Sequence, residues 1–413
     1  MPPNGWLERR RARSAGFPVV EDAQKSDSGL AITENPGNVG LNSPERCLPS
    51  IERSWEKNPE GHEFEGSFLI CASYFSAHRY RGFGDLPARR CRVASKARSQ
   101  PAAMPYGSLD MTYEIQPLAF DPTSLNGLSA KLIGSHHLNN YGGAVRRLNA
   151  IRSELTRLDW SSTPGYRING IKREELIAAN SAFLHELYFQ TLGAGDSLKP
   201  GGLSVAFSRD FGSFERWCNE FSAIGKALAG GSGWVLCSWS TQENRLLNHW
   251  SADHTHLLGG ATPILALDMY EHAYHIDFGA DASSYVETFL LNIDWDKANA
   301  RYAVAVEHAT SDLAVPSDEV LADPEKFLVL DVRRAGAYEA AKSVITGATW
   351  RDPERVEEWS SSLPAKPVVV YCVYGHEVGR ATAAILRSKG IDARFLVGGI
   401  HDWTRADRPV EEK

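Results

Sequence analysis

Two side chains able to bind a metal ion, Asp268 and His272, lie four positions apart in the sequence. The apolar run 264–267 just before them predicts a short buried strand. A carboxylate at the end of that strand and an imidazole four residues later converge if the chain turns there. Such a pair suits iron, manganese or zinc, although it more often forms a simple hydrogen bond. Two further histidines, His136 and His185, lie on separate helical stretches upstream and favour a metal site.

A thiol, Cys372, is the second candidate for chemistry. It follows the apolar run 368–371, which predicts a buried strand, and it precedes a helix-like segment. Backbone N–H groups of such a loop, and of the helix that follows, favour an anion, so they would lower the pKa of the thiol. The motif-free Cys218 and Cys237 lie in apolar patterns and are interpreted as packing residues.

The histidines depend on helices for their positions. A helix that begins after the N-cap Ser129 places His136, Asn140 and Ala144 on one face at four-residue spacing. Further helices are expected at 173–192, 213–228 and 283–293, and strand-like runs at 234–237, 246–250 and 264–267. A helical hairpin followed by a small antiparallel sheet with helices predicts an α+β domain.

The pattern of apolar residues changes after a predicted linker at 306–314. Buried strand-like runs, interpreted as 327–330, 368–371 and 394–397, alternate with helix-like segments. This βαβ rhythm predicts a parallel sheet covered by helices, hence a separate α/β domain at 315–413. The preceding domain is placed at 106–305.

The chain has 413 residues, a net charge of −7 and 43% hydrophobic residues, which allows two or three domains and does not suggest a nucleic-acid partner. No apolar stretch approaches the ~20 residues that span a bilayer, so no membrane partner is expected. Six cysteines without paired spacing indicate a reducing compartment, and we expect a cytoplasmic protein. Residues 1–105 show no period and are predicted to be disordered or untranslated, with Met104 or Met111 as the initiator.

Residues 112–304 resemble the iron/manganese superoxide dismutases. The resemblance rests on segments around the four candidate ligands and on 211–214, 231–234 and 292–295. It implies one iron or manganese ion per subunit, superoxide as substrate, and a solvent molecule in the fifth position. It also implies a homodimer or tetramer in which Glu271 reaches His272 of the partner subunit. By resemblance the ligands are His136, His185, Asp268 and His272.

The second shell departs from the family's pattern. By comparison with the family, a gating Tyr is replaced by Ala144, a histidine by Asn140 and the next by Tyr141, a Tyr by His275, an anion-attracting Arg by Ala282, and a glutamine by Ser181. The site that manganese enzymes use for the glutamine falls near Asp253-His254, so His254 is our candidate solvent partner. Tyr188, beside the second ligand, is a further candidate catalytic residue.

Residues 315–413 resemble the rhodanese family of sulfurtransferases, on segments 330–333, 345–348, 369–372 and 397–400. The resemblance implies that Cys372 carries a persulfide received from a thiosulfate- or persulfide-type donor. The family's loop Arg is replaced near Glu377, and His376 and Arg380 are the remaining cations. A related phosphatase is disfavoured because its Arg would fall at Val378.

The predicted function is metal-dependent disproportionation of superoxide to oxygen and hydrogen peroxide, with a rhodanese domain that carries a persulfide. The alternative is a metal-binding redox or sensor protein with little dismutase activity, in which the rhodanese domain acts as a sulfurtransferase or an interaction module.

Overall fold

The computed structural model describes residues 112–193 and 195–413, which belong to one compact unit. The predictions made for residues 1–105, and the prediction of Met104 or Met111 as the initiator, lie outside the described residues. In the part of the chain that is described, no helix is both long and apolar enough to cross a membrane.

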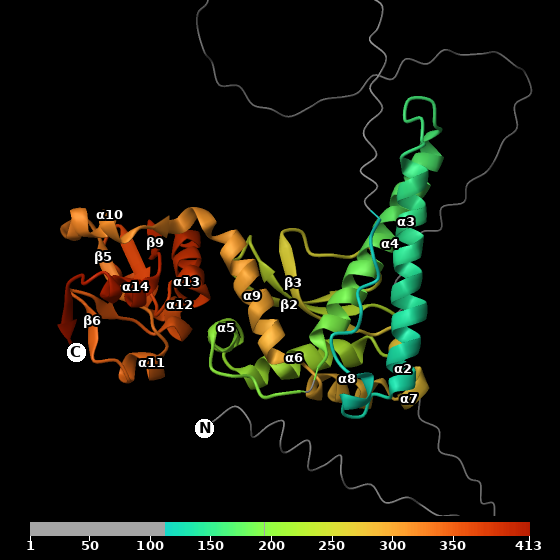
Figure 1. Cartoon of the computed structure of the whole chain (residues 1–413), viewed down its shortest axis with the longest axis horizontal. Coiled ribbons are helices and arrows are strands. Elements are labelled where there is room, and N and C mark those ends of the chain that lie inside the picture. The colour runs from blue at the N-terminus through green and yellow to red at the C-terminus, as the bar shows by residue number, and fades with distance from the viewer. Residues whose placement is uncertain (1–111, 194) are drawn as a thin grey trace, which may run out of the picture. The chain divides into compact units, whose positions relative to one another are not determined.

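A long antiparallel helical hairpin opens the first domain, and Figure 1 shows α3 beside α4. The Ser129 hydroxyl accepts a hydrogen bond from the Leu132 amide at 3.0 Å, which caps the first helix as predicted. A π-helical turn interrupts that helix, so the four-residue face expected for His136, Asn140 and Ala144 is shifted by the wider turn. The elements are α2 (Ala130–Ser135), the π turn (His136–Tyr141), α3 (Gly142–Leu155) and α4 (Gly165–Thr191).

A three-stranded antiparallel sheet of order β2-β1-β3 follows two further helices. Every residue of β1 is buried, and its Trp234 pairs with Asp268 at the end of β3. This sheet was predicted, whereas α5 was not. The elements are α5 (Gly202–Phe211), α6 (Phe214–Ala227), β1 (Trp234–Ser240), β2 (Arg245–Ser251), β3 (Ala261–Asp268), α7 (His275–Phe278) and α8 (Ala282–Leu291).

Helix α9 (Trp295–Ala309) ends the first domain and extends into the predicted linker at 306–314. Val306 is fully buried in the core of this domain, which explains why the helix continues there. The end of the same segment, Ala314–Val315, is already strand β4 of the second domain.

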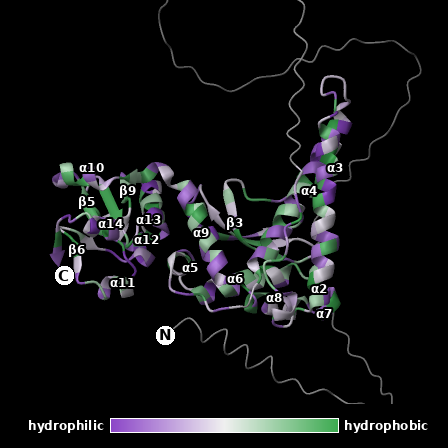
Figure 2. Ribbon diagram, viewed as in Figure 1, coloured by the Kyte–Doolittle hydropathy of each residue, from purple (hydrophilic) through white to green (hydrophobic). Residues whose placement is uncertain are grey.

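A five-stranded parallel sheet of order β4-β9-β8-β5-β7 forms the second domain, with β10 and β6 as a separate antiparallel pair. The central strand β8 is buried throughout, and Figure 2 shows hydrophobic colouring along strands inside this domain. Both predicted fold classes are therefore confirmed. The elements are α10 (Ser317–Ala322), β5 (Leu328–Asp331), α11 (Ala335–Glu339), β6 (Ser343–Ile345), β7 (Thr349–Trp350), α12 (Val356–Trp359), β8 (Val368–Tyr371), α13 (Glu377–Ser388), β9 (Ala393–Leu396), α14 (Gly399–Arg405) and β10 (Val410–Glu412).

Candidate metal centre and sulfur site

Four side chains from separate elements meet inside the first domain. His136 begins the π turn, His185 lies in α4, Asp268 ends β3, and His272 lies in a short 3₁₀ turn, Glu271–Ala273. One potential ligand atom from each lies within 4.8 Å of all the others, and three of the four residues are buried. The structure therefore brings together all four residues predicted from the sequence.

The spacing of these atoms fits a shared metal ion. Asp268 Oδ2 lies 3.1 Å from His136 Nε2, 3.4 Å from His185 Nε2 and 3.2 Å from His272 Nε2. For ligand atoms about 2.1 Å from a common ion, separations of this size correspond to angles of roughly 95–110° at the ion. Three imidazoles and one carboxylate suit iron or manganese in either of two oxidation states.

Hydrogen bonds set the tautomer of His185. Its Nδ1–H donates to the Ser181 carbonyl oxygen at 2.6 Å, which leaves the Nε2 lone pair facing Asp268 and His272. Burial lowers the pKa of His185 to about 3 and also lowers the pKa of His136, so both rings are neutral at pH 7 and able to bind a cation. The buried His136 Nδ1 has no hydrogen-bond partner among the described residues.

The carboxylate of Asp268 is fully buried and held by several groups. Burial opposes its ionisation, but the hydrogen bonds from His136 and His272 outweigh burial and lower the pKa of Asp268. Its Oδ1 accepts from the Tyr270 amide at 2.9 Å, and its backbone oxygen accepts from the Tyr285 hydroxyl at 2.8 Å. These bonds orient the carboxylate so that Oδ2 is left for the three imidazoles.

His254, the candidate solvent partner, lies at the edge of this cluster. Its ring centroid is 6.1 Å from that of His185 and stacks on Tyr270 at 4.9 Å. The indole N–H of Trp234 donates to His254 Nδ1 at 3.0 Å. Because burial lowers the pKa of His254, its ring is neutral and Nε2 carries the proton. The residue therefore offers one N–H donor.

The other two candidates from the first domain lie on different sides of the cluster. The ring of Tyr188 is fully buried, 5.0 Å from that of His136, and its hydroxyl is 3.3 Å from that of Tyr285. It therefore packs behind the ligands. Glu271 is exposed, and no hydrogen bond or ion pair of its side chain is found among the described residues.

The positions that depart from the family differ in their exposure to solvent. Ala144 and Ala282 are buried and carry no polar group, whereas His275 is exposed. Asn140 is partly buried within the π turn. Ser181 stands where the family has a glutamine, and its hydroxyl lies 3.4 Å from His185 Nδ1. The serine side chain is too short to reach past His185.

Cys372 lies in the second domain directly after β8, as predicted. The loop that follows is only four residues long, because α13 begins at Glu377. Burial raises the pKa of the Cys372 thiol, and backbone hydrogen bonds from Gly379, His376, Tyr374 and Gly375 oppose that shift without cancelling it. The amide groups therefore lower the thiol pKa as predicted, but desolvation outweighs them and the pKa of the reduced thiol is raised.

The cations expected near the thiol are arranged differently. Arg380 turns away: its Nε donates to the Gly375 carbonyl at 3.1 Å, and its Nη2 lies 3.2 Å from Glu307 Oε1. His376 is exposed at the pocket that Cys372 lines. Sequence reasoning missed Arg333 and Arg334, which line the same pocket from the end of β5. The run Asp331-Val332-Arg333-Arg334 after a buried strand was the signal that could have found them.

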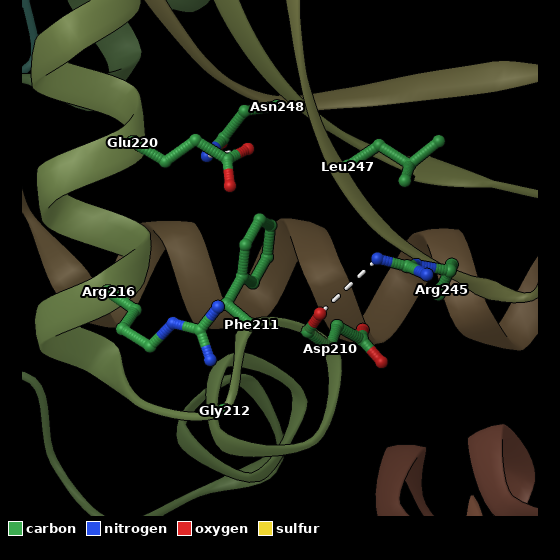
Figure 3. Close-up of a pocket in the computed structure, with 8 residues that line it drawn as sticks. All are labelled: Asp210, Phe211, Gly212, Arg216, Glu220, Arg245, Leu247 and Asn248. Atoms are coloured by element: carbon green, nitrogen blue, oxygen red, sulfur yellow. Dashed lines mark hydrogen bonds between the residues drawn. The ribbon is translucent and has the colours of Figure 1, made fainter.

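A separate pocket of about 370 Å³ lies among α5, α6 and β2. Figure 3 shows Arg216 and Arg245 on opposite sides of Phe211, with Glu220 directed toward Asn248. Glu220 Oε1 accepts from Asn248 Nδ2 at 3.2 Å. The pocket combines cations with carboxylates and contains none of the predicted site residues.

Comparison with known proteins agrees with this division. Residues 199–301 match the family model for the C-terminal domain of iron/manganese superoxide dismutases, and residues 317–406 match the model for the rhodanese-like domain. A relative described as superoxide dismutase [Fe], from Cupriavidus metallidurans, is 58% identical over 196 residues, which is 48% of this chain and 99% of the relative. Superoxide dismutase [Mn] 1 of Halobacterium salinarum is 33% identical over 202 residues, 47% of this chain and 97% of the relative.

The fold and the four-ligand cluster define a metal-binding α+β domain joined to a parallel α/β domain. With the near-complete coverage of these relatives, the chain belongs to the iron/manganese superoxide dismutase family and carries in addition a rhodanese-like domain.

Proposed function

We propose that the first domain disproportionates superoxide to oxygen and hydrogen peroxide, with one iron or manganese ion held by His136, His185, Asp268 and His272. The observation that carries this proposal is the convergence of three imidazole nitrogens and one carboxylate oxygen at separations suited to a single ion. When bound, such an ion supplies alternating acceptance and donation of one electron.

The chain's own residues support the reaction by controlling protons and geometry. Ser181 O holds the His185 ring in the tautomer that exposes Nε2. The N–H at Nε2 of His254 is the donor proposed to hold the solvent molecule, and the Trp234 indole keeps the proton on that nitrogen. Tyr188 buries one side of His136 and excludes water there, which is a positioning role.

We further propose a homodimer in the cytoplasm. Glu271 is exposed beside the partly exposed His272, whose side chain is 27% accessible. A carboxylate of this kind is placed to receive an imidazole N–H from a second copy, so Glu271 would hold His272 of the partner subunit. Sedimentation of wild type and Glu271→Ala tests this: a monomeric wild-type protein would exclude the dimer.

Pulse radiolysis of protein loaded with iron or manganese tests the activity. We expect a second-order rate far above that of the aquated ion, and loss of metal binding in His272→Ala. If metal-loaded wild-type protein is no faster than the aquated ion, the rival function, a metal-binding redox or sensor domain, is supported instead.

A second proposed activity, sulfur transfer, rests on Cys372 and the amides around it. The Cys372 thiolate attacks the outer sulfur of thiosulfate, the S–S bond of the donor breaks, and sulfite leaves with the electron pair. The resulting persulfide then passes its outer sulfur to cyanide, which gives thiocyanate and returns the thiolate. The amides that contact Sγ suit the anionic persulfide. Equal activity of wild type and Cys372→Ser in this assay would remove Cys372 from the reaction.

A further inference from the structure

The pocket at Cys372 is not built by the rhodanese-like domain alone. It has a volume of about 130 Å³, and its lining includes Cys372, Arg334 and Glu377 together with Gly201 and Gly202. The two glycines belong to the start of α5 in the dismutase domain. Residues from both domains therefore line one small pocket around the thiol.

The contact at Gly202 is so close that the Glu377 side chain would have to move to make room for any other residue there. A Cβ atom placed on Gly202 would lie 1.9 Å from Cγ and 2.5 Å from Oε1 of Glu377. Glu377 is the first residue of α13, directly after the Cys372 loop. Its carboxylate is placed at the N-terminal end of α5, where the helix dipole favours a negative charge. Glu377 directly follows residues 373–376, the loop after Cys372 that we call the sulfur loop. This glutamate thus contacts the dismutase domain.

Other contacts hold the same surfaces together. Arg380 of α13 pairs with Glu307 of α9 at 3.2 Å while its Nε holds the Gly375 carbonyl of the sulfur loop. Ala381, also in α13, is fully buried and belongs to the hydrophobic core of the dismutase domain. A side-chain hydrogen bond joins Ser208 of α5 to Glu354. The wall at Gly202 is therefore part of an extensive contact.

The charge of the enclosed pocket favours an anion. Arg333 is engaged by Asp331 through Nε and Nη2, at 2.9 Å and 2.5 Å from Oδ2. Arg334 lines the pocket, and within 112–193 and 195–413 its side chain makes no hydrogen bond or ion pair, although its charge also acts on Glu354. Backbone N–H groups surround Sγ, and the Glu377 carboxylate lies against Gly202.

We infer that the dismutase domain forms one wall of the Cys372 pocket. Because of this wall, small anions reach the thiol, whereas bulky thiols and proteins are excluded from the pocket. The shape of the pocket is inferred independently of sulfur transfer. Only the role of the small anions as sulfur donors rests on the activity proposed for Cys372. Pockets for drug-sized ligands measure about 300–1,000 Å³. A cavity less than half that size has room for a small sulfur oxyanion and none for a peptide.

Alkylation of the full chain tests enclosure without requiring sulfur transfer. Iodoacetate, iodoacetamide and fluorescein maleimide are each reacted with folded and urea-unfolded protein, and labelling of Cys372 is read by peptide mass spectrometry. Relative to the unfolded chain, we expect the folded chain to prefer iodoacetate over iodoacetamide by about tenfold. Labelling by the bulky maleimide should be nearly abolished. Labelling by the maleimide at the unfolded rate would overturn the inference.

A variant in the dismutase domain tests the wall itself. Gly202→Leu places a side chain where Glu377 now lies, and Gly170→Ala is the matched control because a Cβ there meets nothing within 4 Å. We expect the Cys372 labelling rates to change about tenfold or more in Gly202→Leu and to stay unchanged in the control. Unchanged labelling in both variants would remove Gly202 from the pocket.

The two proposals fail in different ways. If wild type forms no persulfide from thiosulfate, the sulfurtransferase activity is excluded, and the alkylation results still decide whether the pocket is composite. If a persulfide forms and passes its sulfur to glutathione as fast as to cyanide, the enclosed pocket is wrong and the activity stands.

Discussion

Single hydrogen bonds decide what each imidazole of the metal centre can do. The Ser181 carbonyl fixes His185, and the Trp234 indole fixes His254, in opposite tautomers. His185 therefore offers Nε2 as a lone pair, whereas His254 offers Nε2 as an N–H donor. Two histidines only 6.1 Å apart are thus suited to different tasks, one to hold a cation and the other to hold a proton.

We predict that His254→Ala lowers both stability and dismutase rate, whereas His254→Gln preserves much of each. Loss of the ring leaves the Trp234 N–H without an acceptor, which costs about 1–3 kcal/mol. A glutamine amide can accept from Trp234 through its oxygen and donate through its nitrogen. Urea denaturation and the pH profile of the metal-loaded enzyme check this. Equal pH profiles for Ala and Gln variants would show that the side chain has only a structural role.

The raised pKa of Cys372 predicts an unusual pH dependence. Because only the thiolate is nucleophilic, alkylation by iodoacetate should rise about tenfold per pH unit through neutral pH and continue to rise at pH 9. The rate is followed at Cys372 by mass spectrometry, with Cys372→Ser as the control for the assigned peptide. A plateau below pH 8 would mean that the loop amides outweigh burial.

At the scale of elements, the end of α5 fixes the sheet next to it. Arg209 and Asp210 form a buried pair with Nε–Oδ1 and Nη2–Oδ2 distances of 2.6 and 2.7 Å. Asp210 Oδ2 also accepts from the Leu246 amide at 2.8 Å, which ties α5 to β2. The Asp210 carboxylate therefore neutralises the buried Arg209 and also accepts the hydrogen bond of the Leu246 amide in β2.

Asp210→Ala is expected to destabilise the protein by about 3–5 kcal/mol, because it leaves the Arg209 guanidinium buried without its carboxylate. Asp210→Asn, which retains an acceptor for Leu246, should be less harmful. The free energy of unfolding from urea titration measures both. A loss below about 1 kcal/mol in Asp210→Ala would contradict a tightly coupled buried pair.

Sequence patterns predicted the strands better than the helix boundaries. The strand ending at Asp268 is apolar and bounded by clear signals, so its end and the turn to His272 were predictable. Helix α5 was missed because Pro200-Gly201-Gly202 at its start is typical of a loop, although Gly202 lies against the side chain of Glu377. That contact comes from a residue 175 positions away, which no local pattern reveals.

The candidate sites show the same limit. Asp268 and His272 could be paired from local spacing, but the family resemblance was needed to add His136 and His185 with assigned roles. Near Cys372, the local cation Arg380 was predicted, whereas the pocket uses Arg334 from another strand end. Parallel strands bring such distant residues to one edge of a sheet, and sequence spacing does not encode which cation turns inward.

At the scale of the whole molecule, the two domains share packed surfaces. Ala381 of the rhodanese-like domain is buried in the dismutase core, and Glu307 pairs with Arg380 across the contact. Separating the two domains would expose apolar surface in both, so we expect them to unfold together. A metal ion that stabilises the first domain should therefore also stabilise the sulfur loop.

Metal removal tests this coupling. Because a ligand that binds only the folded state at 100 times its dissociation constant adds about 2.7 kcal/mol, bound iron or manganese should raise the melting temperature by about 5 °C or more. Differential scanning calorimetry of metal-free and metal-loaded protein should show the transition of both domains shifting together, and His272→Ala should show no shift. Two transitions, of which only one responds to metal, would mean that the dismutase and rhodanese-like domains unfold independently despite their contact.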